Sequence, residues 1–560
     1  MFELSRDTAL AEQQVRALTF CLVAFAYVDG DLDPLERDFI LGELDALAKQ
    51  RAALGPASAA EASAAHWTRE HRVTFEGYVA LVCAHFTESV GDGETSAEFV
   101  ISRLKLGCLE MLERLPDGLQ RKVVQAVEQL MHADGHVHPN EAAFFTKVSA
   151  LLHTELAFVD TDVDDHVLPE IRIASPRELP LPPGADDPLL RDGEWNFSDE
   201  PSTFAQQREA EIARVTHAEE LFRSLRSRGT GVLAQATVLD DLHAGPRWLD
   251  GRVYAQRPDP TRSYELLVLG DLHGCYSCLK AALLQSEFFE KVRRHEADPE
   301  AHPETTLVLL GDYIDRGKFS YTGTLRAALN VFSRYPRQVV MLRGNHEHYV
   351  EFRGRVLAPV RPCEALDSLA NHDGMRLLNA YRRFFDDLPT SFLFGDTLFV
   401  HGGIPRDATF EAKWRGLRSL NDQELAFEMM WSDPSDVDVV PRELQKEVTR
   451  FGFGRRQFQR FMKALGCRVL VRGHERITEG MRVTYDSPDA KLVTLFSAGG
   501  SENGDLPPTS NYRAVTPMAL QLFHRAGVTE LAPFTIDYRT YNSAATNALF
   551  ASELAHVAQA

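Results

Sequence analysis

From about Trp248 onward, short apolar runs recur that each end in Asp, Asn, His or Gly residues. Five of these ends have the sequences GDLHG, GDYIDRG, RGNHE, HGG and RGHE, in chain order. Strands that alternate with helical stretches predict an α/β domain, in which ligands bind at the carboxyl ends of strands. A lone histidine after a strand is usually a packed or solvated residue. Five such ends in order therefore predict one shared site.

The polar side chains at these ends form a set of metal donors. Two aspartates, three histidines and an asparagine provide oxygen and nitrogen ligands that suit Mn, Fe or Zn better than calcium. The absence of cysteine from the set argues against a purely structural zinc site. The donors are Asp271, His273, Asp312, Asn345, His401 and His474.

With WSDP (Trp431–Pro434) and LFSA, the five motifs resemble the phosphoprotein phosphatase family of Ser/Thr phosphatases, within the calcineurin-like metallophosphoesterases. The resemblance covers about residues 260–530. It implies two β-sheets packed face to face as a sandwich, with helices outside and a di-metal centre at one edge. The predicted fold class is thus an N-terminal all-α module followed by an α/β metallophosphoesterase fold.

The resemblance also implies a role for each matched residue. Asp271 and His273 would bind the first metal, Asp312 would bridge both metals, and Asn345, His401 and His474 would bind the second. The metals would be two divalent ions, with Mn expected and Fe or Zn as alternatives.

The remaining implied roles concern the substrate. His346 would be the general acid, oriented by Asp315, and Arg316 and Asn345 would bind the phosphate. A hydroxide bridging the metals would attack phosphorus directly, and the His–Asp pair would protonate the leaving alkoxide. WSDP and LFSA favour a protein Ser/Thr phosphatase acting on phosphorylated proteins. The alternatives are a small-molecule phosphoesterase, such as a bis-nucleoside tetraphosphatase, and a non-catalytic scaffold.

Three positions depart from the family pattern. For the second phosphate-binding arginine, Arg450 is the best candidate, with Arg442, Arg455 and Arg456 as alternatives. The aromatic lid expected after LFSA is replaced by glycines, and Tyr512 could take its place. Cys275 and Cys278 have redox-motif spacing, but the favoured interpretation is two cysteines at the start of a packed helix, with oxidative inactivation as the alternative.

Residues 1–155 show apolar residues at helical spacing and a repeat, VDGDLDPLERDFI at 28–40 and ADGHVHPNEAAFF at 133–145. The repeat could bind a cation through its carboxylates, or it could mark helix ends and starts. Roughly residues 10–155 resemble the TerB-like helical domain, which implies a module that binds a metal or a regulator protein.

Residues 156–245 are expected to be a linker followed by a connecting or docking helix. Residues 155–200 contain 13 acidic residues, three arginines and six prolines, a composition that predicts an extended linker or a Pro-rich recognition motif. Residues 246–545 would form the catalytic domain and residues 546–560 a tail.

The net charge of −21 argues against nucleic acid or an anionic membrane as a partner. Seven scattered cysteines and the absence of a signal-like N-terminus predict a cytoplasmic protein.

Overall fold

The computed structural model describes residues 4–28, 32–53, 60–91, 97–133, 137–152, 171–352, 355–358, 360–370 and 374–551. The chain divides into two compact units. The helical unit contains Met1–Asp162 together with Ser435–Arg455, and the sheet unit contains Val163–Pro434 and Arg456–Ala560. None of the described helices is both long enough and apolar enough to cross a bilayer.

The helical unit is built around one apolar helix. Helix α1 buries every residue from Ala17 to Ala26 and contributes most of their side chains to a core that it shares with the other helices of the unit. The helices from the N-terminal region are α1 (Thr8–Ala26), α2 (Pro34–Ala53), α3 (Ala60–Gly91), α4 (Ala97–Leu112), α5 (Asp117–Leu130) and α6 (Pro139–Leu152). The all-α prediction for this region is confirmed.

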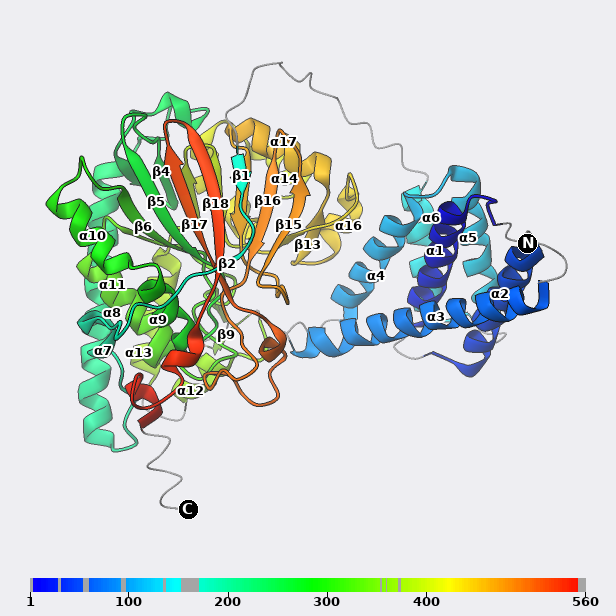
Figure 1. Ribbon diagram of the computed structural model, residues 1–560, viewed down its shortest axis with the longest axis horizontal. Helices are drawn as coiled ribbons and strands as arrows, with labels where there is room; N and C mark the ends of the chain where they lie inside the picture. Colours follow the sequence, from blue (N-terminus) through cyan, green and yellow to red (C-terminus); the bar gives the residue numbers. More distant parts are fainter. Residues whose placement is uncertain are drawn as a thin grey trace. The chain divides into compact units, whose positions relative to one another are not determined.

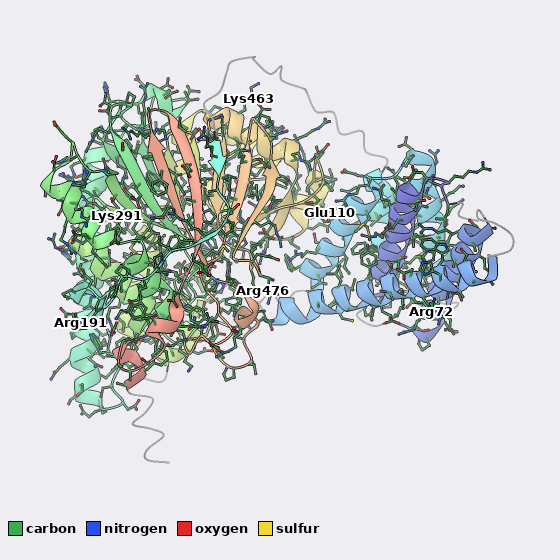
Figure 2. All side chains as sticks on the ribbon, in the orientation of Figure 1. Arg72, Glu110, Arg191, Lys291, Lys463 and Arg476 are labelled. Atoms are coloured by element: carbon green, nitrogen blue, oxygen red, sulfur yellow. The ribbon has the colours of Figure 1, made fainter. Side chains whose placement is uncertain are left out.

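A short segment distant in sequence completes the helical unit. Residues Ser435–Arg455 contain helix α16 (Arg442–Glu447) and strand β13 (Phe451–Phe453). Leu109 of α4 packs in a small apolar cluster with Val437, Val440 and Leu444. Glu110, labelled in Figure 2, accepts a hydrogen bond of 2.6 Å from the hydroxyl of Ser435.

The sheet unit contains two mixed β-sheets. The first has the strand order β1-β18-β17-β5-β6-β7, with β2 beside β18, and the second has the order β15-β16-β14-β11-β10-β4-β3. The first sheet contains β1 (Ile171–Ile173), β2 (Arg177–Glu178), β5 (Ser263–Leu269), β6 (Glu304–Leu309), β7 (Val339–Met341), β17 (Met518–Arg525) and β18 (Val528–Thr535). The second contains β3 (Arg247–Asp250), β4 (Val253–Gln256), β10 (Ser391–Phe394), β11 (Thr397–Val400), β14 (Val469–Arg472), β15 (Met481–Asp486) and β16 (Lys491–Leu495).

The two sheets pack against each other through apolar side chains. Tyr264 of β5 and Phe394 of β10 meet edge to face, with ring centroids 5.4 Å apart. Figure 1 shows helices on both outer sides, with α9–α11 and α13 next to the first sheet and α14 and α17 next to the second. The α-helices that the structure describes in the sheet unit are α7 (Pro188–Arg191), α8 (Pro201–Gly229), α9 (Tyr276–Gln285), α10 (Phe288–Ala297), α11 (Arg326–Arg334), α12 (Glu364–Ala370), α13 (Met375–Asp387), α14 (Asp407–Lys413), α15 (Gln423–Glu428) and α17 (Arg455–Leu465). The predicted α/β sandwich is confirmed.

The acidic segment differs from the predicted linker. Strand β1 pairs in parallel with β18, and Leu190 is fully buried. Several of the acids have local structural roles: Asp187 and Glu200 cap the starts of α7 and α8, and Glu194 pairs with buried Lys280 at 2.6 Å. Composition alone suggested a solvated chain, because it does not reveal which carboxylates are used as caps or ion-pair partners.

Helix α8 packs on the sheet unit, which agrees with the docking alternative for this helix. Val215, Ala218 and Phe222 are fully buried, and Phe222 stacks on Phe332 of α11 at 4.5 Å. At its buried face, Glu211 bonds to the guanidinium of Arg326. Residues 156–170 and 552–560 of the predicted linker and tail lie outside the described residues.

Candidate active site

All five sequence motifs begin where a strand ends, and those strands run in parallel within each sheet. Strands β5, β6 and β7 are parallel neighbours in one sheet, and β11 and β14 are parallel neighbours in the other. Their carboxyl ends meet at one edge of the sandwich, where residue Asp271 forms a bridge to Phe496. The fold therefore brings together residues that are 203 positions apart, such as Asp271 and His474.

Asp312 lies at the centre of the cluster. Its Oδ2 atom is 3.3 Å from Nε2 of His401, 3.6 Å from Nε2 of His273 and 3.9 Å from Nε2 of His346. Its other oxygen, Oδ1, accepts the backbone N–H of His346 at 3.1 Å. One carboxylate oxygen is thus fixed by the backbone, while the other faces three imidazoles.

Asp271 and Asn345 extend the cluster on either side. The Oδ2 atom of Asp271 lies 3.8 Å from Nε2 of His273, and its Oδ1 accepts the backbone N–H of His474 at 2.9 Å. The side-chain oxygen of Asn345 lies 2.9 Å from Nε2 of His401 and 3.1 Å from Nδ1 of His474. The structure brings together all six predicted metal donors.

Burial shifts the pKa values of the carboxylate and imidazole groups in the cluster, and so determines which of them carry charge. Asp271 is 1% exposed, and burial together with the nearby charge of Asp312 raises the pKa of Asp271 to about 7. Burial also lowers the pKa of His273 and His401, which favours neutral imidazoles. Neutral imidazoles beside buried, mutually repelling carboxylates are the donors that a divalent cation requires. Buried triads of His273, Asp312 and His346 and of Asp312, His401 and His474 fit a dinuclear metal centre that shares Asp312.

The backbone at this edge is held in an uncommon conformation. Of the seven non-glycine residues with positive φ in the described chain, five lie in the motifs. They are His273, Asp312, Asp315, Arg316 and His474, with φ between 42° and 70°. Left-handed conformations of such residues cost free energy and persist where the surrounding structure enforces them, often at functional sites.

Two glycines allow the carboxylates to approach the backbone closely. A Cβ at Gly344 would lie 2.1 Å from Oδ1 of Asp312, and one at Gly473 would lie 2.1 Å from Oδ1 of Asp271. Neither contact is possible for a larger residue without displacing the metal-donor carboxylate.

Glu347 is a residue whose role the sequence did not reveal. It ends the RGNHE motif, is fully buried, and accepts the backbone N–H groups of Asp312, Tyr313 and Gly344 at 2.8–3.0 Å. It thereby fixes the ends of β6 and β7 to each other. Its place directly after His346 was the only sequence signal for this role.

Asp433 of WSDP is a second such residue. Its Oδ1 accepts a 2.8 Å bond from Nη2 of Arg472 and lies 3.9 Å from Nε2 of His474. Arg472 is fully buried at the end of β14. The WSDP motif therefore positions the strand end that carries His474.

The predicted acid pair is formed. Nδ1 of His346 lies 2.7 Å from Oδ2 of Asp315, and the other oxygen of Asp315 accepts the backbone N–H of Ala365 at 2.9 Å. Burial raises the pKa of Asp315 to about 6. Bonded to Asp315 through Nδ1, the imidazole of His346 keeps its Nε2 on the side of Asp312.

Arg316 lies beside this pair. It is 7% exposed, and its Nη1 donates to the backbone carbonyl of Pro362 at 2.9 Å and lies 3.5 Å from Oε2 of Glu364. The guanidinium is therefore held in place by the start of α12.

The other sequence candidates have different outcomes. Arg450 belongs to the helical unit, where its guanidinium carbon lies 5.8 Å from the ring of Phe99, and its phosphate-binding role stays a prediction. Tyr512 lies with its ring 5.2 Å from that of His273, in agreement with its suggested place near the site.

Cys275 and Cys278 are fully buried, and burial raises the pKa of the Cys275 thiol well above its usual range. This favours packing over redox reactivity.

Comparison with known proteins agrees with this geometry. Residues 264–476 match the family model described as calcineurin-like phosphoesterase, and this range contains all six predicted metal donors.

Several similar curated proteins carry the name serine/threonine-protein phosphatase. A probable serine/threonine-protein phosphatase of Encephalitozoon cuniculi is 28% identical over 49% of this chain and 54% of its own length. A serine/threonine-protein phosphatase of Caenorhabditis elegans is 30% identical over 41% and 46%, respectively. The catalytic subunit of serine/threonine-protein phosphatase 4 from Saccharomyces cerevisiae is 27% identical over 41% and 68%. The chain thus spans about half the length of the first two relatives.

Proposed function

We propose that the protein is a metal-dependent phosphomonoesterase whose substrates are proteins phosphorylated on serine or threonine. The observation that carries this proposal is the buried cluster around Asp312, with the His346–Asp315 pair beside it. The named activity of the distant relatives supports a phosphoprotein as the substrate over a small molecule.

The proposed ligands are Asp271 and His273 for one metal and Asn345, His401 and His474 for the other, with Asp312 shared. Two bound divalent ions would activate a water molecule and neutralise charge on the phosphoryl group. Mn is the proposed metal, because carboxylate, amide and imidazole donors together suit it.

The chain's own residues would bind the phosphate and supply the proton. Arg316 is proposed to bind phosphate oxygens with its planar guanidinium. His346 is proposed to donate the proton on Nε2 to the leaving serine or threonine oxygen, because such an alkoxide is too basic to leave unprotonated. Asp315 accepts the N–H of Nδ1 and so stabilises the protonated imidazolium, whose second proton lies on Nε2.

The helical unit is proposed to be a TerB-like module that binds a regulator or a cation, a suggestion that rests on the repeat in its sequence. We propose a cytoplasmic location for a different reason. Seven cysteines without a disulfide framework are typical of a reducing compartment.

The proposal is tested by chelating the full-length protein, restoring Mn, and assaying phosphoserine peptides beside diadenosine tetraphosphate. We expect Mn-dependent hydrolysis of the peptides at the higher kcat/KM. The variant His346→Asn should lose this activity, while the matched His348→Asn, two residues away, should retain it. Activity that survives complete metal removal would refute the mechanism, and a clear preference for diadenosine tetraphosphate would replace the substrate class.

A further inference from the structure

A cavity of about 490 Å³ lies at the opposite end of the strands from the metal donors. Glu304, one of its lining residues, begins β6, while Arg262 directly precedes β5 and Arg337 precedes β7. The metal donors follow the other ends of these same strands. Since β5 has seven residues, the two ends are about 20 Å apart. The cavity is therefore separate from the candidate active site, and all its lining residues belong to the sheet unit.

The cavity is strongly basic. Four arginines line it, Arg228, Arg247, Arg262 and Arg337, against a single carboxylate, Glu304. Glu304 lies 3.5 Å from Nη2 of Arg247 and 3.6 Å from Nη1 of Arg262, so its charge is shared between two guanidinium groups. The excess positive charge is surprising in a chain whose net charge is −21. Forked guanidinium groups bind phosphate oxygens in pairs.

Two buried polar atoms of lining residues have no hydrogen-bond partner in the described structure. Arg247 has an 8% exposed side chain, and it donates to Gln256 at 3.1 Å and to Thr306 at 2.9 Å through Nε and Nη2. Its third nitrogen, Nη1, and the hydroxyl of Tyr254 are buried without a partner. Buried donors are rarely left unpaired, because desolvation without a bond is costly. Because both atoms are closed to solvent, a ligand in the cavity would be bound by the more exposed guanidinium groups of Arg228, Arg262 and Arg337.

The same cavity offers a flat apolar surface. The indole of Trp248 is half-buried and lines it, together with the rings of Pro246 and Pro336. A planar ring can stack on an indole, while the arginines hold an anionic group attached to it. The volume lies in the range of sites for small organic ligands, which is about 300–1,000 Å³.

We propose that this cavity binds a small phosphorylated ligand with a planar ring, of mononucleotide size and chemistry, at a site independent of the metal centre. Its phosphate would accept from the guanidinium groups of Arg228, Arg262 and Arg337, and its ring would stack on Trp248.

The test is a titration of the metal-loaded, full-length protein with the methylene phosphonate analogue of AMP, which a phosphoesterase cannot hydrolyse. Binding is followed by tryptophan fluorescence and, independently, by calorimetry. We expect saturable quenching below about 1 mM that is absent in Trp248→Phe. Inorganic phosphate alone and adenosine alone should each bind at least tenfold more weakly.

Reversing the charge of an arginine that lines the cavity tests whether the AMP analogue binds there. Arg337→Glu should weaken binding at least tenfold, whereas Arg334→Glu, an exposed arginine of α11 outside the cavity, should leave it unchanged. Arg316→Ala should also leave the quenching unchanged, because it alters only the metal centre. The proposal is overturned if millimolar analogue gives no quenching, if Arg337→Glu binds normally, if Arg316→Ala abolishes binding, or if phosphate alone binds as tightly as the analogue.

Discussion

The sheet unit and the helical unit use the same kinds of side chain in opposite ways. In the sheet unit, Asp271 and Asp312 both accept a backbone N–H and still face imidazoles: Asp312 does so with separate oxygens, whereas both oxygens of Asp271 accept the N–H of His474. In the helical unit, the acids of the repeat begin helices. Oδ1 of Asp33 accepts the N–H of Leu35 at 2.7 Å, and Glu36 accepts that of Asp33 at 3.1 Å.

The second copy of the repeat shows the same arrangement with a different residue. Nδ1 of His138 accepts the N–H of Asn140 at 3.3 Å, and Glu141 accepts the N–H of His138 at 2.7 Å. Aspartate and histidine thus serve equally as caps at equivalent positions. The described part of the repeat favours helix capping over cation binding, whereas Asp29, Asp31 and His136 lie outside the described residues. The side chains of the sheet unit come from several segments and meet around Asp312, whereas those in the described part of the repeat bond the backbone of their own helix start.

The largest expected effect is on the acid pair. His346→Asn should lower the rate on a phosphoserine peptide by about 10²–10⁴, because the leaving alkoxide loses its proton donor. The loss should be much smaller on p-nitrophenyl phosphate, whose leaving group needs no proton. Steady-state kinetics on both substrates check this, and equal losses on the two would show that His346 does not act as the acid.

The next effect concerns Glu347, which positions residues of the metal centre without touching substrate. Glu347→Gln places an amide where three backbone donors need an acceptor, and we expect activity to fall about 10–100-fold. The Mn concentration for half-maximal activity should rise in parallel. The exposed Glu351→Gln is the control, and an unchanged Mn requirement in Glu347→Gln would argue against this positioning role.

In the helical unit, the contact of α16 with the N-terminal helices can be broken at Glu447. Its carboxylate pairs with Lys105 at 2.9 Å and with Lys147 at 2.5 Å, and the side chain of Lys105 is 7% exposed. Glu447→Ala should lower the unfolding free energy of this unit by about 1–3 kcal/mol, because Lys105 loses its partner while buried. Hydrogen exchange in α4 and α16 measures the change. The exposed Glu443→Ala should behave like the wild type, and matching protection in the two variants would contradict the assignment.

A smaller effect tests the capping role of the repeat. His138→Ala should destabilise α6 by about 0.5–2 kcal/mol, and His138→Asp, which restores the residue type of the first copy, should not. Urea unfolding of the three proteins, with and without added Mn or Ca, provides the measurement. If added cation stabilises the wild type but not His138→Ala, then the repeat binds metal and the contrast between the units fails.

The smallest effect is the pH dependence of the cap of α8. Hydrogen bonds from Thr203 and Ser202 lower the pKa of Glu200 to about 2, from 4.5. A lowered pKa in the folded state adds stability above the unfolded pKa, and this stability is lost as the pH falls. The urea midpoint of Glu200→Gln should therefore lie below that of the wild type from pH 7 to 5, with a gap that narrows below about pH 4.5. The exposed Glu220→Gln should show no such gap, and a gap that persists at low pH would exclude the carboxylate as its source.

The sequence predicted that these six side chains would lie together, because each follows a strand end within a short glycine-containing motif and the fold needs only to align those ends. It did not predict Glu347 or Asp433, since their bonds to backbone and to Arg472 depend on segments brought together by folding. The linker prediction for residues 171–200 differed from the structure for a related reason. Composition counts the charge of Glu194 but does not reveal its buried partner Lys280.

The most direct test of the account is the number of divalent ions per chain after chelation, reloading with Mn and removal of free metal. The wild type should hold two ions and hydrolyse phosphoserine peptides. Asp312→Asn, which alters the carboxylate shared by both triads, should hold fewer than two and lose the activity. Two tightly held ions in Asp312→Asn, or full activity of the wild type with none, would contradict the proposed centre.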